Sequence, residues 1–101
     1  MKAVKSAAAE DDVRQAVDYY LNEAEPDIPL QFIDELEKVT KHVGDWPGSG
    51  SARFAEILGI PGLRSFALAR FPYVVFYIEE DDHVDIWRVL HGKRDIPAVL
   101  Q

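Results

Sequence analysis

The side chains best suited to chemistry on an anion lie in the C-terminal half of the chain: Arg64, Arg70, Arg88, His91, Lys93 and Arg94. Arginine can stabilise charge that develops on a phosphate, and histidine can donate or accept a proton near neutral pH. The same cations can also serve only in surface ion pairs, each worth at most about 1 kcal/mol. We prefer this second interpretation for Arg88, with Asp85 as its partner, and keep both for Arg94, whose neighbour is Asp95.

The sequence contains no motif for a metal site, for binding nucleotide phosphates or for nucleophilic hydrolysis. The chain has no cysteine, and His42, His83 and His91 are too scattered to form a metal-binding motif. Neither of the glycine-rich phosphate-binding motifs occurs, and no GxSxG motif surrounds a serine. We therefore expect neither a metal nor a cofactor.

Three stretches of the C-terminal half are typical of β-strands. Residues 63–70 and 84–91 alternate with a period of two, whereas residues 73–79 are mostly apolar and aromatic. Pro72 cannot donate a hydrogen bond to a sheet and should separate the first two strands. Short turns link antiparallel neighbours, so we expect an antiparallel meander with residues 73–79 as a central strand covered on both faces. Residues 2–5 could add a short edge strand, where lysines would discourage unwanted pairing.

The N-terminal half has the three-and-four spacing of two amphipathic helices. Asp27 is the expected N-cap of the second helix and Gly44 its C-cap. The apolar stripe of the first helix is Val13, Ala16, Val17, Tyr20, Leu21 and Ala24, and that of the second is Phe32, Leu36, Val39 and Val43. The predicted fold is α+β: an N-terminal helical hairpin packed on one face of a small antiparallel sheet of three to four strands, with the other face left partly open.

A few positions are harder to place. We expect Trp46 to cover the core between helices and sheet, because tryptophan buries a large area wherever it can. Trp87 and Tyr77 should form a cross-strand packing pair. Residues 52–58 are ambiguous, and Ile96–Leu100 suits either a last helical turn or an extended tail.

Length and charge limit the classes of protein. The 101 residues suit one domain spanning 1–101, and 48% hydrophobic residues exclude a disordered chain. No segment resembles a signal peptide or a membrane span, so we expect a cytoplasmic protein. The net charge of −7 disfavours nonspecific binding to nucleic acid. Residues 1–50 carry 5 cations and 11 acids whereas residues 51–101 carry 6 and 7, which leaves room for a cationic patch on the sheet.

The C-terminal half also contains a distinctive order of motifs. Arg70-Phe71-Pro72-Tyr73 opens an aromatic strand, an acidic tip follows at residues 79–82, and the next strand runs into His91-Gly92-Lys93-Arg94-Asp95. This order resembles the ParE branch of the RelE/ParE toxin superfamily, the plasmid-stabilisation toxins of type II toxin–antitoxin systems. With the N-terminal helices included, the resemblance spans nearly the whole chain.

The resemblance implies a bacterial toxin that inhibits DNA gyrase by binding it, without catalysis. It implies a cognate, ParD-like antitoxin that covers the toxin with a helix or a strand in a hetero-oligomer. It implies neither a membrane partner nor sequence-specific binding to nucleic acid. Target binding would fall on Arg64, Arg70, His91, Lys93 and Arg94.

Two alternatives keep the same fold. A RelE-like, ribosome-dependent mRNA endoribonuclease would use Arg70 and Arg94 on the phosphate and His91 for proton transfer. However, RelE-like nucleases carry a tyrosine in the C-terminal segment, and this chain has Leu100 at the corresponding place. The third hypothesis is an inactive, complex-forming member of the family, which would agree with the acidity of the chain.

Overall fold

The computed structural model describes residues 1–94 and 96–100. A 3₁₀ turn at Pro47–Ser49 joins the N-terminal helical half to the rest of the fold. The strands and α-helices follow in the order β1 (Lys2–Lys5), α1 (Ala7–Glu23), α2 (Ile28–Asp45), α3 (Arg53–Leu58), β2 (Leu63–Ala67), β3 (Tyr73–Glu79), β4 (His83–His91) and α4 (Ile96–Leu100).

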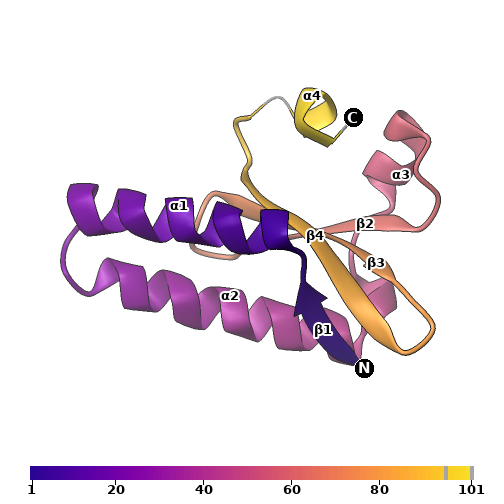
Figure 1. The fold of residues 1–101 in the computed structure, drawn as a ribbon, viewed down its shortest axis with the longest axis horizontal. Coiled ribbons are helices and arrows are strands. Elements are labelled where there is room, and N and C mark those ends of the chain that lie inside the picture. Colours follow the sequence, from indigo (N-terminus) through magenta and orange to yellow (C-terminus); the bar gives the residue numbers. More distant parts are fainter. Residues whose placement is uncertain (95, 101) are drawn as a thin grey trace.

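The strands form a single four-stranded sheet in the order β1-β4-β3-β2 (Figure 1). The predicted antiparallel meander is confirmed, because β3 pairs antiparallel with both β2 and β4. The predicted N-terminal edge strand is confirmed as well, although β1 runs parallel to β4. The pairing of β3 with β4 shifts by one residue, since Phe76 lies opposite Arg88 and Tyr77 opposite Ile86. Trp87 is therefore the extra residue of a β-bulge.

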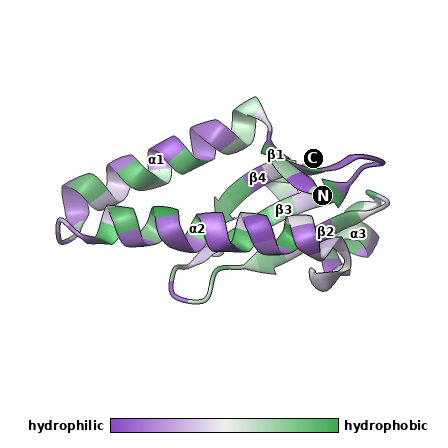
Figure 2. Cartoon of the chain, turned by 90° about the horizontal axis from the view of Figure 1, so that it is seen from below, coloured by the Kyte–Doolittle hydropathy of each residue, from purple (hydrophilic) through white to green (hydrophobic). Residues whose placement is uncertain are grey.

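The helical hairpin of α1 and α2 covers one face of the sheet. Hydrophobic and hydrophilic residues alternate along both helices (Figure 2), as in amphipathic helices. The second helix buries the predicted residues Phe32, Leu36, Val39 and Val43, and the strands contribute Val75, Tyr77, Val84, Ile86 and Val89. The predicted packing of a helical hairpin on the sheet is therefore confirmed.

The second face of the sheet is also covered, by the short helices α3 and α4 (Figure 1). Phe76 packs there against Phe54 of α3, with ring centroids 5.3 Å apart. Val75, the neighbour of Phe76, packs with the helical hairpin. The prediction that β3 is covered on both sides is thus confirmed, and two short helices occupy the face that we expected to stay partly open.

Part of the predicted stripe of α1 is wrong. Leu21 is 63% exposed, and Ala24 follows the last residue of the helix and is exposed. The physical reason is visible in Figure 1, where the closed end of the hairpin projects past the sheet. Leu21 belongs to the last turn of α1, at this projecting end, whereas Tyr20 reaches Phe32 and Tyr73.

Two local predictions near the end of α2 are wrong. Gly44 is not the C-cap but a buried residue within α2, which ends at Asp45 with Trp46 as C-cap. A Cβ on Gly44 would lie 2.6 Å from the carbonyl oxygen of Met1, because the chain start packs against this turn of the helix. Trp46 is 66% exposed and does not cover the core. The N-cap position of Asp27 is confirmed, although its side chain accepts a hydrogen bond from Gln31 rather than from a capped backbone N–H.

Candidate functional site

A groove opens between α1 and the end of the sheet where β4 terminates. Its volume is about 570 Å³. One wall comes from the buried side of α1, and the other from the start of β3, the end of β4 and the segment that follows. The lining residues are Asp12, Gln15, Ala16, Tyr19, Tyr20, Pro72, Tyr73, Val89, His91 and Arg94.

Backbone hydrogen bonds fix the cationic run at the end of β4. The N–H of Gly92 donates to the carbonyl of Pro72 (2.8 Å), and the N–H of Arg94 donates to the carbonyl of His91 (3.1 Å). The N–H of Lys93 donates to Nδ1 of His91 (3.1 Å). Because Nδ1 is an acceptor, the neutral imidazole carries its proton on Nε2, which makes that atom a hydrogen-bond donor.

Two tyrosines of the groove, Tyr20 and Tyr73, can donate hydrogen bonds at neutral pH. The ring of Tyr73 contacts His91 edge-on, with centroids 5.3 Å apart, and Tyr20 contacts Tyr73 at 6.3 Å. Burial raises the pKa of both Tyr20 and Tyr73, and in Tyr73 the charge of Arg94 opposes that effect. Both phenols therefore stay protonated at neutral pH.

The structure does not gather all the predicted site residues. His91 and Arg94 line the groove, and the exposed Lys93 lies between them in the chain. Arg70 is not among the lining residues and instead forms an ion pair with Glu35 of α2, at 3.6 Å between Nε and Oε1. Asp95, the expected partner of Arg94, lies outside the described residues.

Arg64 belongs to a different polar cluster, on the half of β3 away from the groove. Its Nη1 donates to the carbonyl of Gly50 (2.8 Å). The hydroxyl of Tyr77 accepts from the N–H of Gly50 (2.9 Å) and donates to the carbonyl of Pro47 (2.7 Å). The expected packing pair of Tyr77 with Trp87 is wrong, because the bulge at Trp87 turns that side chain to the face covered by α3 and α4.

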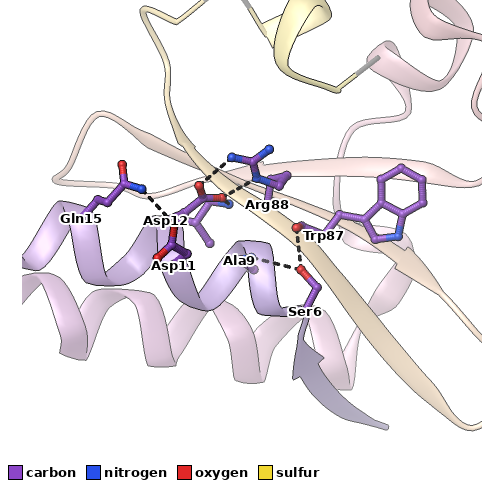
Figure 3. A network of polar contacts seen from close by, with 8 residues as sticks. Ser6, Ala9, Asp11, Asp12, Gln15, Trp87 and Arg88 are labelled. Atoms are coloured by element: carbon purple, nitrogen blue, oxygen red, sulfur yellow. Dashed lines mark hydrogen bonds and ion pairs between the residues drawn. The ribbon is translucent and has the colours of Figure 1, made fainter.

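The predicted partner of Arg88 is also wrong. Arg88 binds Asp12 of α1 in a bidentate ion pair, with Nε to Oδ2 and Nη2 to Oδ1 both at 2.7 Å (Figure 3). The side chain of Asp12 is only 6% exposed. The hydrogen bond to Asp12 raises the pKa of Arg88 above its ordinary value. Asp85 is not the partner of Arg88, because Arg88 lies at the edge of the sheet that α1 crosses and meets Asp12 there.

Asp12 lines the groove but was not among the site residues predicted from the sequence. A signal was present. Ala9, Asp12 and Ala16 follow the three-and-four spacing of the buried side of α1, and all three are buried. A carboxylate on a buried stripe needs a cationic or hydrogen-bonding partner, and this requirement could have directed the search toward Arg88.

Within residues 1–94 and 96–100, no three His, Cys, Asp or Glu side chains gather closely enough to hold a metal ion. Of the helices in the same residues, none combines the length and apolar character that crossing a bilayer requires.

Comparisons with known proteins agree with one another. Residues 4–96 match the model of a family described as the ParE toxin of type II toxin–antitoxin system, parDE. A solved structure titled "Chromosomal ParDE TA system from P. aeruginosa" contains a chain with the same fold, with a TM-score of 0.74 and 19% sequence identity, covering 90% of this chain and 95% of that chain. No curated protein sequence matches significantly.

Proposed function

Because the chain belongs to the ParE toxin family of type II toxin–antitoxin systems, we propose that it inhibits DNA gyrase by binding it. The contact is the groove end of the sheet, with His91, Lys93 and Arg94 at its centre and Arg70 at its margin. A cognate ParD-like antitoxin neutralises the toxin. Both partners meet the protein in the cytoplasm.

The observation that carries this proposal is the kind of polar group in the groove. Arg94 supplies a cation, His91 a donor at Nε2, and Tyr20 and Tyr73 two protonated phenols. These groups bind a carboxylate or another acceptor well. Arg70, which a nuclease would need beside Arg94, is paired with Glu35 instead. The arrangement therefore favours binding over proton transfer.

The distribution of charge favours a protein as target. The carboxylate of Asp12 is matched by Arg88, so it does not cancel the charge of Arg94 in the groove. The chain as a whole carries −7 and would be repelled by a polyanion. A cationic groove on an acidic protein suits an acidic patch on a protein surface better than a nucleic acid.

The antitoxin is expected to bind as a helix rather than as an added strand. Ser51 already pairs with Ser65 on the outer side of β2, through hydrogen bonds of 2.8 and 2.9 Å. On the other side of the sheet, β1 is only four residues long and begins and ends with lysine. A helix lying in the groove would cover His91 and Arg94, and this contact would account for neutralisation.

The test is a gyrase supercoiling and DNA cleavage assay with the purified protein. We expect inhibition of supercoiling that disappears when the cognate antitoxin is added. Absence of any effect on gyrase at saturating protein would contradict the proposal. The matched control is ribosome-dependent cleavage of mRNA, which we expect to stay at background.

A nuclease is the second candidate, and one contact favours it. Tyr73 lies against His91 and would supply the tyrosine that the C-terminal segment lacks at Leu100. Cleavage of mRNA that is lost in Tyr73→Phe, without any effect on gyrase, would favour this function. Harmless expression without the antitoxin would instead favour the inactive member of the family.

A further inference from the structure

The partner strand β1 covers only the first part of β4. Lys2–Lys5 pairs with the residues from His83 to Ile86, and the N–H of Ser6 then donates to the carbonyl of Ile86 (3.0 Å). From Trp87 onward the outer edge of β4 has α1 beside it instead of a strand (Figure 3). An edge strand leaves backbone donors and acceptors that must be satisfied in another way.

Side chains at the start of α1 take over this role. The hydroxyl of Ser6 donates to the carbonyl of Trp87 (2.8 Å) and also accepts from the N–H of Ala9 (3.0 Å), so it caps the helix and the strand edge together. Two turns further along, Oδ2 of Asp12 accepts from the N–H of Val89 (3.0 Å). The helix is thus hydrogen-bonded to the strand at two points.

Of the two contacts between α1 and β4, the one at Asp12 is the stronger, because it includes the ion pair with Arg88. The carboxylate of Asp12 accepts hydrogen bonds from the backbone N–H of Val89 and from two of the three guanidinium nitrogens of Arg88, Nε and Nη2, at the same time. Buried, charge-assisted and bidentate hydrogen bonds are the strongest and most directional in proteins. Arg88 also lines a cavity beside Trp87, Val99 and Leu100, so its side chain links α1 to the opposite face of the sheet.

The same carboxylate fixes the geometry of the groove. Ala16 and Tyr19 follow Asp12 on the same side of α1 and form one wall. His91 and Arg94 follow Val89 by a few residues and form the other wall. The spacing and relative orientation of the two walls of the groove are therefore determined by the contact of Asp12 with β4.

We infer that Asp12 is the positioning residue of the cationic run His91, Lys93 and Arg94: it aligns the end of β4 with α1 so that these side chains meet the target together. Asp12 acts through Arg88 and Val89 and does not itself need to touch the target. The consequence for gyrase rests on the proposed function, whereas the alignment of the groove can be tested separately.

The first test compares Asp12→Asn with Asp11→Asn in the gyrase assay. The amide keeps an acceptor oxygen for Val89 but loses the charge that holds Arg88. Asp11 is exposed, hydrogen-bonds to Arg14 and Gln15, and acts on Arg88 through a weaker charge interaction without a hydrogen bond among the described residues. We expect the inhibitory concentration to rise about tenfold for Asp12→Asn and to stay within about twofold for Asp11→Asn. Arg88→Lys provides a second variant if Asp12→Asn does not fold, and should cause a similar loss because lysine cannot bind in bidentate fashion.

Two further variants distinguish a positioning role of Asp12 from a purely structural one. Val39→Ala lowers stability from the core of α2 without touching the ion pair, and should leave inhibition unchanged while the protein is folded. In an Arg94→Ala background, Asp12→Asn should still lower the denaturation midpoint but add less than its full loss of inhibition, because only His91 and Lys93 remain to be positioned. Unchanged inhibition by folded Asp12→Asn, or a full additive loss in the double variant, would overturn the inference.

A measurement that does not use gyrase distinguishes the positioning role of Asp12 from the proposed function. Nuclear magnetic resonance of the free protein should show that the signals of His91 and Arg94 move in Asp12→Asn and Arg88→Lys but not in Asp11→Asn. If the wild type fails to inhibit gyrase while these signals move, the proposed function fails and the positioning role stands. If the signals do not move in either variant, the positioning role is wrong whatever gyrase does.

Discussion

The two ends of the sheet use similar residues in opposite ways. At one end, Arg64, Tyr77 and Gly50 satisfy one another in a closed cluster beneath the 3₁₀ turn. At the other end, His91 and Arg94 line a groove together with tyrosines whose phenols stay protonated. Each end has cations and aromatic hydroxyls. Within residues 1–94 and 96–100, Arg64 and the hydroxyl of Tyr77 have internal hydrogen-bond partners, whereas none is found for the guanidinium of Arg94 or the hydroxyls of Tyr20 and Tyr73.

This difference separates residues that stabilise the fold from residues available to a partner. A polar group that is satisfied internally contributes to stability and loses that contribution when it is mutated. A group that faces a groove is free to bind and can be removed at little cost to the fold. Variants of Arg64, Tyr77 and Gly50 should therefore change stability, and variants of His91 and Arg94 should change binding to the target.

The largest expected effect is that of Gly50→Ala at the closed end. A Cβ on Gly50 would lie 2.5 Å from the hydroxyl of Tyr77 and 2.8 Å from the backbone carbonyl of Ser65. We expect a loss of about 3 kcal/mol in the free energy of unfolding and a fall of about 15 °C in the melting temperature. Gly48→Ala is the control, because its added Cβ would have no described residue within 4 Å apart from its own chain neighbours. Equal stability of the two variants would show that the closed cluster is not tightly packed.

Tyr77→Phe should have the next largest effect. It removes a buried hydroxyl and leaves the N–H of Gly50 and the carbonyl of Pro47 without this partner. The expected loss is about 2 kcal/mol in the free energy of unfolding, measured by denaturant titration. The control Tyr19→Phe, at a site that is 58% exposed, should change stability by less than about 0.5 kcal/mol. A loss in Tyr19→Phe as large as that in Tyr77→Phe would contradict the comparison.

Arg70→Ala should have a small effect on activity and almost none on stability. Its side chain is 64% exposed and its ion pair with Glu35 is long, so we expect a change in the free energy of unfolding below about 0.5 kcal/mol. As a residue at the margin of the contact, it should weaken gyrase inhibition about two- to threefold. Arg53→Ala on α3, an exposed arginine on the second face, should leave inhibition unchanged. Complete loss of activity in Arg70→Ala would instead favour the nuclease arrangement with Arg94.

The smallest effect should come from His83 and Asp82, beside the tip between β3 and β4. Their hydrogen bond (2.7 Å) raises the pKa of His83 and lowers that of Asp82. Protonated His83 thus favours the folded state. The contribution of His83 to stability is present below the ordinary pKa of histidine and is lost as the pH rises through the raised pKa. The contribution of Asp82 is present above the ordinary pKa of aspartate and is lost as the pH falls through the lowered pKa.

Asp82→Asn tests this contact. The stability difference between wild type and variant should be small and confined to the interval between the two pKa values, as measured by urea unfolding over a range of pH. A difference that persists at pH 9 would mean that the contact does not depend on the charge of His83.

The sequence was sufficient for the elements whose patterns are local. Residues 73–79 are too apolar for an exposed strand, and Pro72 marks its start, so the meander followed directly. Phe32, Leu36, Val39 and Val43 had no competing pattern and were placed correctly in the core. His91 and Arg94 were named from the sequence as target-binding residues; both line the groove, and their role in binding a target stays a prediction.

The missed features depend on contacts between distant residues. Gly44 is buried because the first residue of the chain packs on it, and Arg88 pairs with Asp12 across 76 positions. The side chain of Trp87 lies on the opposite face of the sheet from Tyr77, because of a single-residue bulge that no alternation pattern shows. Leu21 fits the helical stripe but is exposed near the end of α1 that projects past the sheet (Figure 1), and helix periodicity says nothing about where the sheet ends.

The most direct test of the central claim compares Arg94→Ala with Arg64→Ala in two assays, gyrase supercoiling and denaturant unfolding. We expect Arg94→Ala to weaken inhibition at least about tenfold, which corresponds to 1.4 kcal/mol, with little change in stability. Arg64→Ala should lower the free energy of unfolding by about 1–2 kcal/mol and leave inhibition intact. Strong inhibition by Arg94→Ala, or inhibition lost in Arg64→Ala while it is fully folded, would contradict the assignment of the two ends.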